Sequence, residues 1–291
     1  MRTHSFLRPL VHLIVLGVAA AIGVEMPAHA QSAPNQERAR EELKRGVEAY
    51  KQSDIEQAIL HFRRAKEIDP SFVNARLYLA TAFAALYIPG APSDENRQNG
   101  ESAILEFRGV LEIEPNNLSA IDGMGSVLSN MAGNPFDLDK FVESKIFHKK
   151  HIELAPDDAD PYYWIGFINW TISYRANDDL RTAHNEKADE PIAPGEPLPT
   201  SVRADFAACC DAWITEGIEH LNKATSLKPD YASAFAYLNL LYRLRADLME
   251  SEADRQTCLD FADSLVHVYK TIKQKELERA KPQEPDSSPL S

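Results

Sequence analysis

The chain has 291 residues and a formal net charge of −13, from 31 Lys and Arg against 44 Asp and Glu. Clustered positive charge, which a protein needs to bind nucleic-acid phosphates, is therefore not expected. The apolar (44%) and charged (26%) fractions are those of a folded protein, and three cysteines are too few for a disulfide-built scaffold. The composition thus excludes a disulfide-rich scaffold and argues against a nucleic-acid partner.

The first thirty residues have the three parts of a secretory signal peptide. Arg2 and Arg8 form a basic beginning, residues 13–24 form an apolar run, and Ala30 ends a small-residue cleavage motif before Gln31. The apolar run is shorter than the ~20 residues of a membrane-spanning helix. We therefore predict cleavage between Ala30 and Gln31, export to the periplasm, and no stable membrane insertion of the mature chain.

A short linker is expected after the cleavage site, over residues 31–38, and then a helical pattern that ends in proline recurs four times. Each copy begins with a small residue, has a larger residue four positions later, and closes with the helix-ending proline. The copies begin at Ala58, Ala103, Ser144 and Gly217. Because their internal spacing is identical, the sequence predicts a repeated helical unit.

A second amphipathic helix precedes each of the last three copies and carries a small residue near its middle: Ala80, Gly125 and Gly166. The first copy has Gly46 at the same offset. The arrangement resembles the tetratricopeptide repeat (TPR), a helix-turn-helix unit of 34 residues. The resemblance implies an all-α TPR solenoid of about five repeats over residues 39–275. The repeats start near residues 39, 73, 118, 159 and 232.

Three insertions interrupt the repeats, and they have the proline and glycine content of loops. They cover residues 88–102, 132–139 and 177–200, and the longest contains four prolines. We expect this longest insertion to be mobile or extended. A helical pattern resumes near residue 201 and predicts an unusually long second helix in the fourth repeat.

The chain ends with a predicted closing helix and a tail. Apolar residues at helical spacing between residues 244 and 272 indicate a helix with a polar outer face, which a terminal repeat needs as a cap. Residues 276–291 are charged and rich in proline and serine, and we expect them to be disordered.

The resemblance to TPR proteins implies that the first helix of each repeat lines a concave groove. Tyr163, Phe167 and Trp170 stand at i, i+4 and i+7, so they share one helix face that can grip an apolar side chain or peptide. The alternative is that this face packs under the longest insertion or against the long helix. The candidate groove contacts are Tyr50, Asn74, Asp122, Tyr163, Phe167, Trp170 and Arg243.

No motif for catalysis is found in the sequence. It contains no G-x-S-x-G, no phosphate-binding P-loop and no H-E-x-x-H. His148 and His151 lie one helical turn apart, as metal ligands can, but they occupy the packing positions of their repeat and no third ligand accompanies them. We therefore predict that the protein is not an enzyme and has neither a metal site nor a cofactor.

The three cysteines allow one disulfide bond in an oxidising compartment. Cys209 and Cys210 are neighbours, and a bond between them would strain the peptide. The hypothesis is a bridge from one of them to Cys258, with Cys210 as the candidate, which would tie the long helix to the closing helix.

The leading functional hypothesis is a secreted, periplasmic TPR scaffold that binds a protein or peptide through its groove and loops. The alternative is a ligand-holding periplasmic accessory subunit of a solute transporter. A closed apolar cavity under the longest insertion would favour the alternative, whereas an open groove would favour peptide binding. The sequence indicates neither the identity of the partner nor the oligomeric state.

Overall fold

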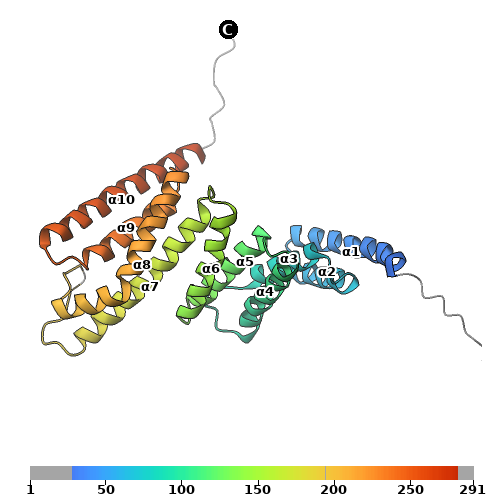
Figure 1. The fold of residues 1–291 in the computed structure, drawn as a ribbon, viewed down its shortest axis with the longest axis horizontal. Helices are drawn as coiled ribbons and strands as arrows, with labels where there is room; N and C mark the ends of the chain where they lie inside the picture. The colour runs from blue at the N-terminus through green and yellow to red at the C-terminus, as the bar shows by residue number, and fades with distance from the viewer. Residues whose placement is uncertain (1–27, 194, 281–291) are drawn as a thin grey trace, which may run out of the picture.

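The computed structural model describes residues 28–280 with the exception of residue 194, and this part of the chain folds into ten helices (Figure 1). None of these helices combines the length and apolarity needed to cross a bilayer. Most of the predicted signal peptide and the end of the predicted tail lie outside the described residues. The helices are α1 Ala28–Lys51, α2 Ile55–Ile68, α3 Val73–Leu86, α4 Asp94–Ile113, α5 Leu118–Ala132, α6 Leu138–Leu154, α7 Asp160–Asn185, α8 Thr200–Leu227, α9 Ala232–Ala246 and α10 Glu252–Ala280.

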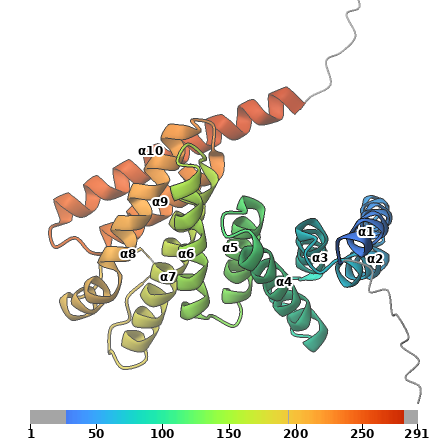
Figure 2. The same cartoon turned by 45° about the vertical axis from the view of Figure 1, so that its right-hand side comes forward.

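Consecutive helices pair, and the five pairs stack along the long axis of the molecule (Figures 1 and 2). The predicted repeat starts at residues 73, 118, 159 and 232 fall on or next to the first residues of α3, α5, α7 and α9. Contacts between the first helices of neighbouring pairs join α1 to α3, α3 to α5, and α7 to α9. The expected all-α solenoid with TPR architecture is confirmed.

In the pairs α1–α2, α5–α6 and α7–α8, the two helices approach closely because the first helix carries a glycine where the second carries a large side chain. A Cβ built on Gly46 would lie 2.4 Å from the Phe62 ring, and one built on Gly166 would lie 2.3 Å from Leu221 Cγ. Such distances leave no room for any side chain on the glycine. The close approach buries Phe62 and Leu221 completely and forms part of the core of their pairs.

The insertion at residues 88–102 is mostly helical, contrary to expectation, because α4 begins at Asp94. Only residues 87–93 form the connection, which the buried side chain of Asn96 holds through two 2.7 Å hydrogen bonds to the backbone of Ile88. Gly100 lies inside α4 as a packing residue, since an added Cβ would be 2.7 Å from Met131 Sδ. The insertion at residues 132–139 does contain the expected connection, between α5 and α6.

The longest insertion is also shorter as a loop than predicted, because α7 continues to Asn185. The remaining loop, residues 186–199, is packed against the solenoid, not extended as we expected: Ile192 and Leu198 are buried. The side chain of Asn185 accepts a hydrogen bond from the Ile192 backbone N–H (2.8 Å) and donates one to its carbonyl (3.2 Å). Two apolar anchors and one side-chain amide thus order a segment that its prolines suggested to be loose.

The predicted long second helix of the fourth repeat and the predicted closing helix are both present. The segments predicted at the two ends of the solenoid differ from expectation. Helix α8 has 28 residues and α10 has 29, as the long second helix and the closing helix require. Residues 31–38, predicted as a linker, belong to α1. Residues 276–280 of the predicted tail continue α10. Helix-forming polar residues extend α10 outward, and α1 begins early enough to contain Pro34.

The replacement Gly166→Ala tests the close approach of the paired helices. Overpacking in a core costs about 1–3 kcal/mol, which exceeds the helix propensity that alanine gains over glycine, up to about 1 kcal/mol. Urea unfolding should therefore show a less stable protein. The control is Gly133→Ala, where an added Cβ would meet nothing nearer than 3.9 Å; equal stability of the two variants would contradict the packing account.

Candidate functional site

An aromatic surface covers the faces of α7 and α9 that lie side by side. Tyr237 of α9 packs against all three predicted residues of α7, with ring centroids 5.9 Å from Tyr163, 5.0 Å from Phe167 and 5.0 Å from Trp170. Six of the seven rings are partly exposed and Tyr174 is 53% exposed. We define the aromatic surface as Tyr163, Trp164, Phe167, Trp170, Tyr174, Tyr231 and Tyr237.

The structure leaves this face half-buried. Its main neighbour is α9, which adds rings of its own. Phe167 also packs in one cluster with Trp213 of α8, and Trp170 lines a cavity together with Ile192 of the loop 186–199. Burial of the hydroxyl groups raises the pKa of Tyr163 to about 12 and also raises the pKa of Tyr237. Both phenols are therefore neutral at physiological pH, and the surface presents uncharged rings.

A cavity of about 710 Å³ adjoins the aromatic surface, between α7, the loop 186–199, α9 and α10. Trp170 and Tyr174 belong to both the surface and the cavity wall. The other lining residues are Asn177, Asp178, Arg181, Thr182, Asn185, Ile192, Gly195, Leu240, Arg243, Leu244, Asp247, Arg255 and Leu259.

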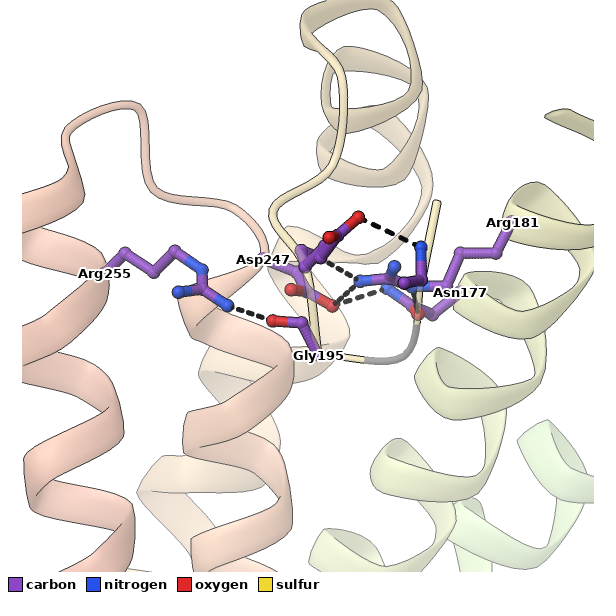
Figure 3. Close-up of polar contacts among 7 residues, drawn as sticks. Asn177, Arg181, Gly195, Asp247 and Arg255 are labelled. Atoms are coloured by element: carbon purple, nitrogen blue, oxygen red, sulfur yellow. Dashed lines mark hydrogen bonds and ion pairs between the residues drawn. The ribbon is translucent and has the colours of Figure 1, made fainter. Parts of the chain in front are cut away.

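Arginine side chains fasten the loop over this cavity, as Figure 3 shows. Arg181 Nη2 donates hydrogen bonds to Asp247 Oδ2 at 3.0 Å and to the carbonyl oxygen of Glu196 at 3.1 Å. Arg255 Nη2 donates to the carbonyl oxygen of Gly195. The loop is thus held from α7 on one side and from α10 on the other.

The structure brings four of the seven predicted groove residues together. Tyr163, Phe167 and Trp170 share the aromatic surface, and Arg243 lines the cavity beside Trp170.

The other three predicted residues lie in the N-terminal repeats. Tyr50 on α1 and Asn74 on α3 are exposed and far along the solenoid from the aromatic surface (Figure 1). Asp122 on α5 contacts His151 of α6 at a depression of about 170 Å³ that Trp164 also lines. Tyr50 and Asn74 are therefore separate from the aromatic surface, whereas Asp122 lies at its edge, beside Trp164.

The two histidines pack in the repeat, as their positions predicted. His148 is buried and stacks on Trp164, with centroids 5.9 Å apart and planes inclined by 6°. Burial lowers the pKa of His148 to about 4, so it is neutral. His151 lies between Asp122 and Asp158. Over the described part of the chain, no three His, Cys, Asp or Glu side chains are grouped as metal ligands would be.

The predicted bridge between Cys210 and Cys258 is not formed, and all three cysteines are free thiols. Cys210 lies in the core that α7, α8 and α9 share, with its Sγ 2.8 Å from that of Cys209. Burial raises the pKa of the Cys210 thiol and keeps it protonated. Cys258 is on α10, beside Arg245. The spacing of the cysteines in the sequence does not reveal that Cys210 is buried in the core whereas Cys258 lies on α10 and is partly exposed.

A buried ionic network supports the aromatic surface from behind. Lys145 of α6 is 5% exposed; its Nζ pairs with Glu216 of α8, donates to Asn169 Oδ1 of α7 at 2.7 Å, and lies 4.1 Å from the Trp213 ring centroid. Asn169 also donates to Glu216 Oε2 at 2.9 Å. Trp213 in turn packs in the cluster that contains Phe167. The network therefore fixes α7 relative to its neighbours.

Sequence reasoning missed several residues of the site because it ended the first helix of the fourth repeat too early. The stripe that begins at Tyr163 continues at helical spacing through Tyr174 and Asn177 to Arg181. Continuing this helical period from residue 177 onward identifies Asn177 and Arg181. Asp247 and Arg255 come from other helices, and no local pattern marks them.

The class of protein follows from the architecture: the chain has the fold of a TPR solenoid. Solved structures similar to it include the MamA protein, with a TM-score of 0.55, 15% identity, and coverage of 86% of this chain and 99% of that one. A MamA fragment, 41-end, from Desulfovibrio magneticus RS-1 gives a TM-score of 0.52 at 15% identity, over 84% and 98% of the two chains.

YrrB, described as a TPR protein with an unusual peptide-binding site, aligns with a TM-score of 0.50 at 12% identity, over 85% of this chain and 98% of its own. No family model and no curated protein matches the sequence. At these identities the likeness establishes the fold alone.

The network around Glu216 predicts a specific pH dependence of stability. Burial raises the pKa of Glu216, but hydrogen bonds from Lys145, Lys149 and Asn169 outweigh it and lower the pKa from 4.5 to about 2. The folded state therefore gains stability above pH 4.5 and loses it as the pH falls towards about 2.

Glu216→Gln should reduce the free energy of unfolding at pH 7 by about 1–3 kcal/mol, because it leaves a buried cation without its carboxylate. The difference from the wild type should shrink as the pH falls from 4.5 to about 2. Urea unfolding at several pH values measures it, with Glu143→Gln on the more exposed pair with Arg108 as the control. A difference independent of pH would contradict the assignment.

Proposed function

We propose that the protein is a binding scaffold that holds a peptide segment of a partner protein on the aromatic surface of α7 and α9. The observation that carries this proposal is the grouping of seven aromatic rings that pack against one another. Each of the seven rings remains at least partly exposed. Aromatic side chains dominate the energetics of protein interfaces because they offer a large rigid contact area. A folded chain rarely leaves so many rings together at its surface without a partner.

The chemistry of the surface defines the segment that fits it. The rings are uncharged, so they favour large apolar side chains at spacings that match the rows of rings on two adjacent helices. The chain as a whole carries a net charge of −13, which repels acidic segments. The favoured partner is therefore an apolar segment with neutral or basic flanks. The TPR fold, and the peptide-binding site named for YrrB, support a peptide over other occupants.

The cavity chemistry favours binding over catalysis. Of the residue types that act as nucleophiles or bases, its lining contains Tyr174, Asp178, Thr182 and Asp247, with no histidine, cysteine or lysine beside them. Asp247 is already paired with Arg181. It also differs from the closed apolar cavity that a transporter accessory subunit would need, since several lining residues are exposed and three are arginines. The scaffold proposal is therefore preferred to that alternative.

We further propose that the scaffold acts in the periplasm. The basic beginning at Arg2 and Arg8, the apolar run over residues 13–24 and the small residues before Gln31 support export by a cleaved signal peptide.

Peptide selection tests the binding proposal. Phage display of random peptides on the exported chain should enrich sequences with at least two large apolar side chains. Trp170→Ala and Tyr237→Ala should each weaken the selected peptides at least tenfold, the equivalent of about 1.4 kcal/mol. Calorimetric titration measures the affinity.

The matched control for these variants is Tyr78→Ala, which removes a 42% exposed ring on α3 outside the aromatic surface. It should change the affinity less than twofold, and circular dichroism should show equal helicity for all variants. Enrichment of acidic peptides, or affinities that Trp170→Ala and Tyr237→Ala leave unchanged, would overturn the proposal.

The mass of the exported protein tests the proposed export to the periplasm and the proposed cleavage site. Expression with the full leader in a bacterial host should give a periplasmic protein whose first residue is Gln31. Intact-mass spectrometry of that fraction measures the start of the chain. Recovery of the protein only in the cytoplasm, with residues 1–30 intact, would contradict export.

A further inference from the structure

Two guanidinium groups in the wall of the 710 Å³ cavity have nitrogen atoms without an acceptor. Arg181 Nη1 and Arg255 Nε are buried, and neither has a hydrogen-bond partner among the described residues. The other nitrogens of Arg181 are engaged, with Asn177, Asp247 and the loop. A buried donor left unpaired costs about 1–3 kcal/mol, and more when it is charged. Both groups are therefore suited to an additional acceptor.

One of the three arginines that line the cavity lacks a close carboxylate partner. Arg181 pairs with Asp247, and Arg243 pairs with Asp263. The nearest carboxylate to Arg255 is that of Glu252, 3.5 Å away and 69% exposed, so the charge of Arg255 is weakly matched. Asp178 and Asp247 would repel an anion with two or more charges.

Six lining residues give the wall an apolar part, and the cavity is large enough for an organic molecule. Ligand cavities in proteins usually measure about 300–1,000 Å³ and combine apolar walls with a few polar anchors. The apolar lining residues come from α7, the loop 186–199, α9 and α10: Trp170, Tyr174, Ile192, Leu240, Leu244 and Leu259.

We propose that this cavity binds a small organic monocarboxylate. The carboxylate pairs with the guanidinium of Arg255, Arg181 Nη1 supplies further donors in the same wall, and the apolar body lies against Trp170 and its neighbours. Inorganic phosphate fits less well, because it would leave the six apolar side chains without contact. The site goes beyond the peptide-binding proposal and does not depend on it, although the two share Trp170 and Tyr174.

Calorimetric titration of the exported chain with 3-phenylpropionate tests the site. We expect saturable binding with one molecule per chain. The neutral analogue 3-phenylpropionamide, which has the same shape, should bind at least tenfold more weakly. Inorganic phosphate at the same concentration should not compete.

Two variants locate the site by different means. Arg255→Gln removes the anchoring charge and should weaken 3-phenylpropionate at least tenfold. Leu259→Glu leaves Arg255 in place but sets a carboxylate one turn away on α10, where it competes with the ligand for the guanidinium. Leu259→Glu should abolish binding. Because it keeps Arg255, which donates to Gly195 of the loop, this loss is separate from any loosening of the loop that Arg255→Gln causes. The control is Arg97→Gln, an equal change of charge at an exposed arginine of α4, which should bind as the wild type does.

The outcomes separate this site from the peptide site. Phe167→Ala should weaken selected peptides and leave 3-phenylpropionate binding unchanged, whereas Arg255→Gln should do the reverse. The proposal is overturned by absence of saturable binding to 3-phenylpropionate, by equal affinity for the amide, by competition from phosphate, or by wild-type affinity in both Arg255→Gln and Leu259→Glu.

Discussion

The contact of a glycine on the first helix with a large side chain on the second closes the pairs α1–α2, α5–α6 and α7–α8. Phe62 fills the space above Gly46, His148 the space above Gly125, and Leu221 the space above Gly166. Because these pairs close in this way, successive pairs can stack, and first helices come to lie side by side. The aromatic surface depends on this stacking, since it forms only where α7 meets α9. Ionic pairs such as Lys145 with Glu216 then fix one repeat on the next.

The sequence predicted the repeats well because their periodicity is local. The repeat starts predicted at residues 73, 118, 159 and 232 fall within one residue of a helix start, since spacing of small and large residues follows directly from helix geometry. The start predicted at residue 39 lies inside α1, which begins at Ala28. The same reasoning fails where one residue type has two uses. Glycine content predicts a loop over residues 88–102, yet Gly100 packs inside α4 against Met131. The prolines of residues 186–199 suggested a loose segment, yet Ile192 and Leu198 anchor it.

The candidate site was predictable only in part, for a related reason. The ladder of Tyr163, Phe167 and Trp170 is visible on one helix, so its shared face followed from spacing alone. The cavity beside it is assembled from α7, a loop, α9 and α10, and contacts such as Arg181 with Asp247 span 66 residues of sequence. A single sequence contains no signal for such long-range pairs. The aromatic surface and the arginine cavity thus form adjacent regions of different chemistry, one suited to apolar side chains and the other to a single negative charge.

The central functional claim is that the aromatic surface contacts a partner in the cell. A photo-crosslinking amino acid in place of Phe167 tests it most directly, with the same substitution at Tyr78 as the comparison, in cells that export the protein. Mass spectrometry of the products should identify crosslinks to another protein from position 167 and none from position 78. Equal crosslinking from both positions, or crosslinks from position 78 alone, would contradict the account.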